Sequence, residues 1–230
     1  MRINTKVEKE TNAMCGTVVD HIIDQVARKE YNVGDRLPPE RELSIQLNVS
    51  RATAREALKV LNYLGFIETQ QGSGNYITDD YNKTTANIMK VMYLRGDVDF
   101  EGFTEFRKML ELHSFELALK NATEKQKKEM EQIVNLLDLT TDSTLIVTLD
   151  NHFHTLLVEA SGNPLMIINY SALSIAITEY MSETFRDTVS KKESGFEKLQ
   201  EYHHAIIDAL ISKDRKKGRQ AIIDHFNLLH

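Results

Sequence analysis

The stretch from Gly34 to Ile77, GDRLPPERELSIQLNVSRATAREALKVLNYLGFIETQQGSGNYI, predicts two helices joined by a turn and followed by a β-hairpin. Pro39 suits the first turn of a helix, where its missing N–H leaves no hydrogen bond unmade. Asn48 ends this helix, and Ser50 is expected to cap the next one by accepting a backbone N–H. Gly65 then supplies a left-handed stop. The core-facing residues of the second helix recur at helical spacing: Ala54, Ala57, Leu58, Leu61 and Leu64.

The polar side of the second helix carries two cations one turn apart, Arg51 and Arg55. We expect Thr53 on the same side, so that one face of the helix packs on a core and the other fits a major groove. The hairpin that follows has the tip QQGSGN, residues 70–75, whose glycines allow the backbone to approach a phosphate or to enter a minor groove. An ordinary αα-hairpin followed by a surface turn is the alternative, and the ordered addition of the hairpin favours a winged helix-turn-helix.

This stretch closely resembles the winged helix-turn-helix of the GntR family of bacterial transcription regulators. The runs GDRLPPEREL and VSRATAREAL and the GSG wing tip carry the resemblance. It implies binding to double-stranded DNA at a short inverted-repeat operator. The residues that it places on DNA are Arg41, Ser50, Arg51, Thr53, Arg55, Gln71 and Gly72. Ala52 replaces a hydroxyl residue that the fatty-acid-responsive branch often has, which bears on the operator sequence rather than on DNA binding.

Composition limits the class of protein. A chain of 230 residues with a single cysteine, Cys15, forms no internal disulfide, which suits a reducing cytoplasm. We find no signal peptide and no apolar run of about 18 residues, and so expect no membrane association. The net charge of −6 is unusual for a DNA-binding protein, although Arg36 to Lys59 is locally basic. Weak binding per protomer is therefore expected, and with it a homodimer.

A polar segment after the hairpin marks a boundary between two domains. We predict a winged domain at residues 13–79, a linker at 80–84 and a helical domain at 85–230. Helical patterns dominate the second domain, which favours an antiparallel all-α bundle in a mainly α protein. The expected helices span residues 85–94, 103–121, 123–139, 145–160, 165–185, 191–212 and 215–230.

Four residues of the second domain have the character of metal ligands. Asp150 and His154 share a helix face because they are four residues apart, while His203 and His225 lie among core-type residues of two later helices. One carboxylate and three imidazoles suit a divalent transition metal with positions left open. Each histidine taken alone is more often an ordinary core or surface residue than a ligand.

The second domain resembles the all-helical FCD-type effector domain of the FadR branch of the GntR family. The segments FTEFRKMLELHSFELAL, LDNHFHTLLVEASGNPLM and EYHHAIIDALISKDRKKGRQAIIDHF carry this resemblance. It implies that the family's four metal ligands fall on Asp150, His154, His203 and His225, at the floor of a pocket for a small organic acid. Arg107 lies on the opening helix and is a candidate partner for the effector's carboxylate. A surface salt bridge with Glu111 is an equally favoured role for Arg107.

These observations predict a regulator of transcription, not an enzyme, whose operator binding responds to a small carboxylate effector. Zinc is the expected metal, and nickel or manganese suit the same ligands. Two alternatives stay open. A metal sensor would respond to the ion alone, and a metal-dependent hydrolase would use the same four residues for catalysis with the winged domain as a tether.

Overall fold

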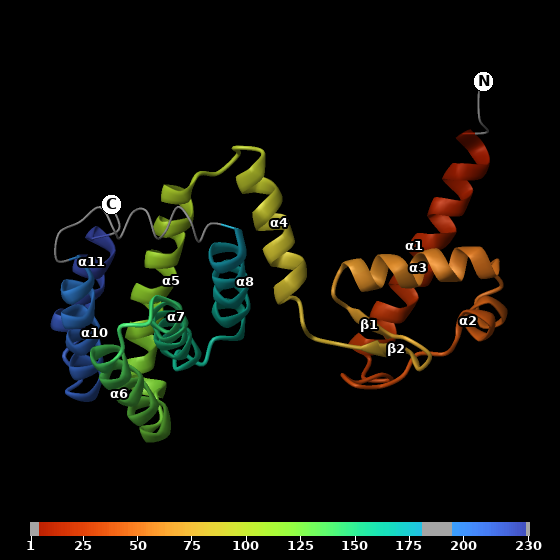
Figure 1. Ribbon diagram of the computed structural model, residues 1–230. Helices are drawn as coiled ribbons and strands as arrows, with labels where there is room; N and C mark the ends of the chain where they lie inside the picture. Colours follow the sequence, from red (N-terminus) through yellow and green to blue (C-terminus); the bar gives the residue numbers. More distant parts are fainter. Residues whose placement is uncertain (1–4, 181–194, 229–230) are drawn as a thin grey trace. The chain divides into compact units, whose positions relative to one another are not determined.

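The computed structural model describes residues 5–180 and 195–228 of a mainly α-helical chain (Figure 1). The chain divides into two compact units, residues 1–84 and 85–230. Among the described residues, no helix has the length and apolar character that crossing a membrane requires.

The first unit is a winged helix-turn-helix. Its elements are α1 (Thr5–Ala27), α2 (Glu40–Gln46), α3 (Arg51–Tyr63), β1 (Ile67–Gln70) and β2 (Gly74–Ile77). Ser50 caps α3 as predicted, because its hydroxyl accepts the Thr53 N–H at 3.0 Å. Pro39 lies one residue earlier than predicted: it is the extended N-cap of α2, and the helix begins at Glu40. Asn48 and Gly65 adopt positive φ angles, of 51° and 68°, where α2 and α3 end.

The wing is an antiparallel hairpin in which Ile67 pairs with Ile77 and Gln70 pairs with Gly74. Gly74 has a φ of 128°, a backbone conformation that favours glycine. A Cβ atom at this position would lie 2.9 Å from the Arg36 Nε atom, at the end of a side chain that can move aside, so the backbone angle is what calls for glycine here. Apolar residues of all five elements, together with Leu37 from the segment between α1 and α2, form the core of the unit: Val18, Ile22, Leu37, Leu43, Ala54, Ala57, Leu58, Leu61, Ile67 and Ile77.

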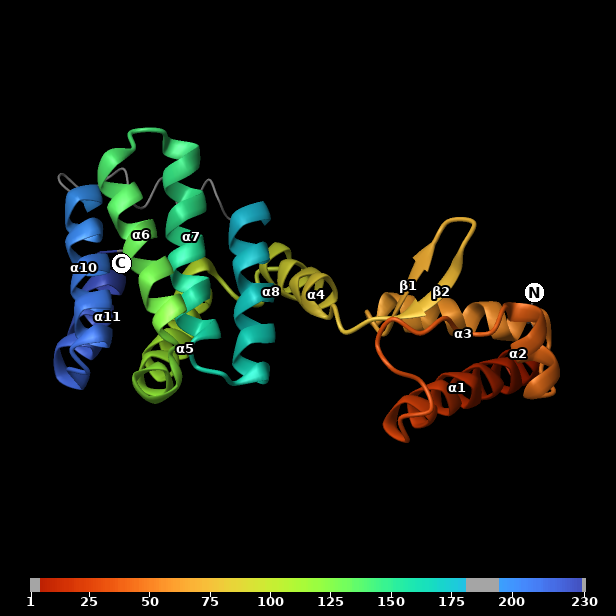
Figure 2. The same ribbon diagram turned by 90° about the horizontal axis from the view of Figure 1, so that it is seen from below.

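The second unit is an antiparallel helical bundle (Figures 1 and 2). Its helices are α4 (Asn82–Leu94), α5 (Phe100–Asn121), α6 (Glu124–Leu139), α7 (Ser143–Glu159), α8 (Pro164–Tyr180), α10 (Gly195–Ile211) and α11 (Arg215–Asn227). Thr123 caps α6 in a reciprocal capping box with Gln126. The last residues of the helix predicted at 165–185, the first of that at 191–212 and the last of that at 215–230 lie outside the described residues.

Two apolar clusters hold the bundle together. The larger one joins α5, α6, α7, α10 and α11, and the smaller one joins α4, α5, α7 and α8. Gly218 on α11 faces the Phe115 ring of α5, and a Cβ atom at this glycine would lie 1.9 Å from the ring. The close approach of α11 to α5 therefore depends on glycine.

Candidate functional site

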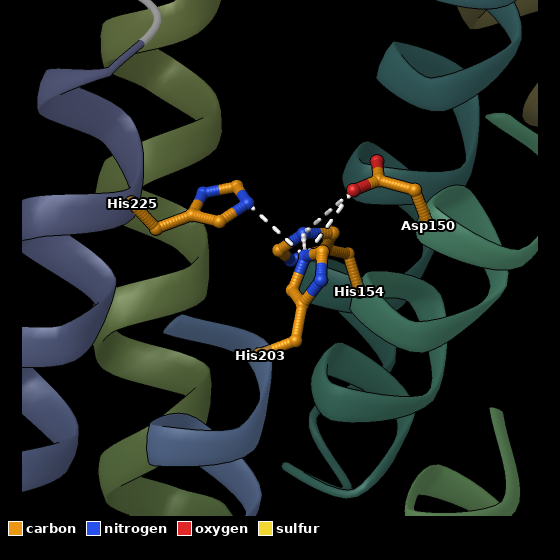
Figure 3. Close-up of side chains that lie close together, drawn as sticks. All are labelled: Asp150, His154, His203 and His225. Carbon is orange, nitrogen blue, oxygen red and sulfur yellow. Dashed lines mark hydrogen bonds and ion pairs between the residues drawn. The ribbon is translucent and has the colours of Figure 1, made fainter. Parts of the chain in front are cut away.

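Three helices bring the four predicted metal ligands together inside the bundle (Figure 3). Asp150 and His154 project from successive turns of α7, His203 from α10 and His225 from α11. One donor atom from each residue can be chosen so that all four atoms lie within 4.8 Å of one another. The three histidines are buried, with 0–2% of their surface exposed. The grouping predicted from sequence is therefore present in the fold.

The His203 Nε2 atom lies at the centre of the cluster. It is 3.1 Å from His154 Nε2, 3.1 Å from His225 Nε2 and 3.2 Å from Asp150 Oδ1. A neutral imidazole carries one proton, so this nitrogen can donate to at most one of the three neighbours. A cation at the centre would instead accept a lone pair from each atom. The crowding of lone pairs thus fits a metal ion better than a set of hydrogen bonds.

The separations also agree with the size of a transition-metal site. Ligand atoms about 2.0–2.1 Å from zinc at tetrahedral angles lie ~3.3 Å apart. Three of the observed separations are 3.1–3.2 Å, and that between His154 Nε2 and Asp150 Oδ1 is 3.7 Å. Three imidazoles and one carboxylate are also the donor types that zinc, nickel and manganese accept. The four residues therefore fit the divalent transition-metal ion that the sequence predicts.

A buried carboxylate that the sequence analysis did not identify as part of the site contacts the side of His154 that faces away from the other ligands. Glu111 on α5 is fully buried, and its Oε2 atom lies 2.6 Å from His154 Nδ1. Its other oxygen accepts hydrogen bonds from Arg107 Nε at 2.8 Å and from the Tyr170 hydroxyl at 2.9 Å. The spacing of four residues between Arg107 and Glu111 was the available signal, but it indicated only a surface ion pair.

Arg107 itself is buried, with 6% of its surface exposed, so the expectation of a surface salt bridge with Glu111 is wrong in its location. The pairing of Arg107 with Glu111 is present, but the ion pair is buried because α5 packs against α8 and α11. Arg107 Nη2 lies 3.8 Å from Asp150 Oδ2. Among the described residues this nitrogen has no hydrogen-bond partner. A buried donor without a partner beside a candidate metal ligand is available to an anion.

Burial and neighbouring charges set the protonation of the cluster. Burial lowers the pKa of His203, and burial together with repulsion from a protonated His154 lowers the pKa of His225 further. Burial also opposes the charged form of His154, but Glu111 and Asp150 outweigh it and raise its pKa. Burial likewise opposes the charge of Asp150, and the ion pair with His154 overcomes this and holds its pKa well below the usual range. Two imidazoles are thus held neutral, as ligands must be.

Two further histidines are neighbours of the ligands in sequence, but their side chains point away from the cluster. His152 lies on the outer side of α7, 3.8 Å from Glu129, and His204 pairs with Asp138 at 2.7 Å. Both are substantially exposed. Neither belongs to the group of converging donor atoms.

The predicted DNA-contacting residues are exposed in the first unit, with one exception. Arg51 and Arg55 project from the N-terminal half of α3 into solvent. The other exposed members of the set are Arg41, Ser50, Gln71 and Gly72. Thr53 is buried, with 4% of its surface exposed, so the expectation that it shares the exposed face is wrong. Its hydroxyl lies 2.8 Å from that of Ser50, because the capping geometry turns it back under the start of the helix.

Comparisons with known proteins match both units. The family described as "Bacterial regulatory proteins, gntR family" matches residues 15–77, and the FCD domain matches residues 103–228. The chain is 27% identical over 198 residues to the HTH-type transcriptional regulator LutR of Bacillus subtilis (strain 168), covering 85% of this chain and 90% of LutR. It is 28% identical over 219 residues to the HTH-type transcriptional repressor NanR of Citrobacter rodentium (strain ICC168), covering 91% and 81%.

A solved structure, Streptococcus agalactiae GntR, superposes with a TM-score of 0.68 at 26% identity and covers 93% of this chain and 97% of its own. The two matched families account for the winged unit and for the bundle that holds the histidine cluster. The chain therefore belongs to the GntR family of bacterial regulatory proteins, as a DNA-binding transcription regulator of the FadR type with an FCD effector-binding domain.

Proposed function

We propose that this regulator binds a short inverted-repeat operator as a homodimer and that a small carboxylate effector, bound at a metal site in the bundle, changes its affinity for DNA. The observation that supports this proposal most strongly is the convergence of one carboxylate and three imidazole nitrogens in the effector-binding domain. Similarity to NanR, which is named a transcriptional repressor, supports repression as the direction of control.

On DNA, the proposed contacts divide by type. Arg51 and Arg55 lie at the exposed start of α3, where a recognition helix meets base edges, and their guanidinium groups suit bidentate contacts to guanine. Arg41, Ser50, Gln71 and Gly72 are proposed to position the helix and the wing on the sugar–phosphate backbone. The buried Thr53 contributes to this set through the cap that it shares with Ser50, which fixes the start of α3.

In the bundle, Asp150, His154, His203 and His225 would hold the metal, for which zinc is the first candidate. Such an ion supplies a Lewis-acidic position that a carboxylate oxygen can occupy. Arg107 Nη2 has no hydrogen-bond partner among the described residues and lies 3.8 Å from Asp150 Oδ2, so it is placed to donate to the second oxygen of the effector's carboxylate. Recognition would thus combine one metal contact with one charged hydrogen bond.

Coupling to DNA requires that the acid bind one arrangement of the bundle better than another. Helix α4 leads from the winged unit into the bundle, and its Met89 and Tyr93 side chains pack against the smaller apolar cluster. That cluster contains Tyr170, whose hydroxyl bonds Glu111 behind His154. A change at the ligand cluster can therefore reach α4 through directly contacting residues.

A direct test begins with selection of the operator from random duplex DNA by the zinc-loaded protein. Small hydroxy acids and sugar acids are then added singly, and operator affinity is measured with and without EDTA. We expect at least one acid to change the affinity of wild-type protein and to have no effect on Arg107→Ala, which keeps its operator binding. Affinity that follows free zinc without any acid would favour the metal sensor, and turnover of an acid or ester would favour the hydrolase.

A further inference from the structure

Glu111 divides its two carboxylate oxygens among three neighbours of different chemistry. Oε1 accepts from Arg107 Nε at 2.8 Å and from the Tyr170 hydroxyl at 2.9 Å. Oε2 lies 2.6 Å from His154 Nδ1. All of these groups are buried. The carboxylate therefore stands between a permanent cation on one side and a candidate metal ligand on the other.

We propose that Glu111 is a positioning residue that keeps the His154 proton on Nδ1 and so presents the bare Nε2 lone pair to the centre of the cluster. This inference rests on the proposed metal site. An ionised carboxylate can only accept, so its partner Nδ1 must donate. A neutral imidazole has one proton, which leaves Nε2 free to coordinate. Outer-shell carboxylates act in this way on metal-bound histidines in general.

Arg107 and Tyr170 in turn fix the orientation of Glu111. A guanidinium group offers donors only, so the atom that faces Arg107 Nε must be an acceptor. Arg107 Nε also lies 3.1 Å from the Tyr170 hydroxyl oxygen, which leaves that hydroxyl to donate to Glu111. Helices α5, α7 and α8 thus meet at the Glu111 carboxylate, which accepts hydrogen bonds from Arg107 and Tyr170 on one oxygen and from His154 on the other.

The substitution Glu111→Gln tests this direction at almost unchanged volume. The amide offers one acceptor oxygen and one donor NH2 group, and the Arg107 side tolerates only the oxygen. The NH2 group must then face His154 Nδ1, which favours the opposite tautomer with the proton on Nε2. That proton points at the other ligand atoms. We expect the tautomer of His154 to reverse and zinc affinity to fall by roughly 10–100-fold, the usual loss for an outer-shell change.

The experiment combines imidazole ¹⁵N NMR with zinc competition. Spectra of zinc-free protein, recorded at an alkaline pH where imidazoles are neutral, should show His154 protonated at Nδ1 in wild type and at Nε2 in Glu111→Gln. Zinc affinity is measured against a chromophoric chelator. Glu116→Gln is the matched control on the same helix, because Glu116 pairs with Arg215 and Arg219 instead of the histidine cluster. It should keep the wild-type tautomer and affinity.

Two results would overturn the proposal: wild-type His154 protonated at Nε2, or a folded Glu111→Gln with unchanged tautomer and zinc affinity. Should Glu111→Gln not fold, the wild-type spectrum decides the question without any variant. A wild-type protein that binds no zinc would refute the proposed metal site, whereas the zinc-free spectrum would still decide the role of Glu111. The two failures are therefore distinguishable.

Discussion

Replacing His203 by alanine should abolish most of the stabilisation that zinc gives to the bundle. His203 Nε2 lies within 3.2 Å of a donor atom on each of the other three residues, so its loss removes the central ligand. At free zinc 100-fold above Kd, binding stabilises a folded protein by about 2.7 kcal/mol. For a unit the size of residues 85–230, each kcal/mol raises Tm by roughly 2–4 °C. Zinc should therefore raise the Tm of the wild-type bundle by roughly 5–11 °C.

The zinc affinity of the variant should fall by at least ~100-fold, which is the upper end of the loss caused by replacing a residue that only hydrogen-bonds to a metal ligand. At the same free zinc concentration the stabilisation then falls to about 0.4 kcal/mol, and the rise in Tm to roughly 2 °C or less. Calorimetry of EDTA-treated and zinc-saturated samples measures the difference within each protein, which separates metal loss from lost packing. His113→Ala, an exposed histidine on α5, should respond to zinc as wild type does. An undiminished rise in Tm for His203→Ala would refute the assignment of this residue as a ligand.

Four further predictions follow from the two units. Arg51→Ala and Arg55→Ala should each weaken operator binding by about 1–3 kcal/mol per half-site, while their circular dichroism spectra stay unchanged. If footprinting shows that both variants bind the operator with wild-type affinity, neither arginine contacts the bases. Gly218→Ala should destabilise the bundle by about 1–3 kcal/mol in urea, because its Cβ would overlap a buried phenyl ring; Gly16→Ala, in open space on a helix, should instead stabilise by about 0.5–1 kcal/mol. Zinc affinity should fall as the pH decreases, and the fall should begin above pH 6.5, because the raised pKa of His154 makes it take up a proton at a higher pH than an ordinary histidine does. Zinc affinity that stays constant in chelator competition between pH 8 and 6 would contradict this prediction. Sedimentation at micromolar concentration should show a dimer without DNA, and a monomer alone would count against the homodimer.

Local signals in the sequence were sufficient for the elements and for the composition of the site. Ser50 caps α3 and Gly65 ends its C-terminal turn as predicted, because a cap or a left-handed stop depends on a few neighbouring residues. The winged helix-turn-helix and the helical bundle were likewise confirmed. The convergence of Asp150 with three histidines was also predicted, since helical spacing and the resemblance to a family specified the same four positions.

The burial of individual side chains and their contacts with residues distant in sequence were decided only by the tertiary structure. Periodicity assigns a residue to a helix face, but packing determines whether that face is covered, and so the exposure of Thr53 and of the Arg107–Glu111 pair was predicted wrongly. Tyr170 is 59 residues from Glu111 in sequence, and their hydrogen bond exists because α8 packs against α5. No local pattern encodes such a meeting. The sequence therefore determined which side chains are available for chemistry. The packing of the helices determined which of these side chains are buried away from water and which of them contact one another.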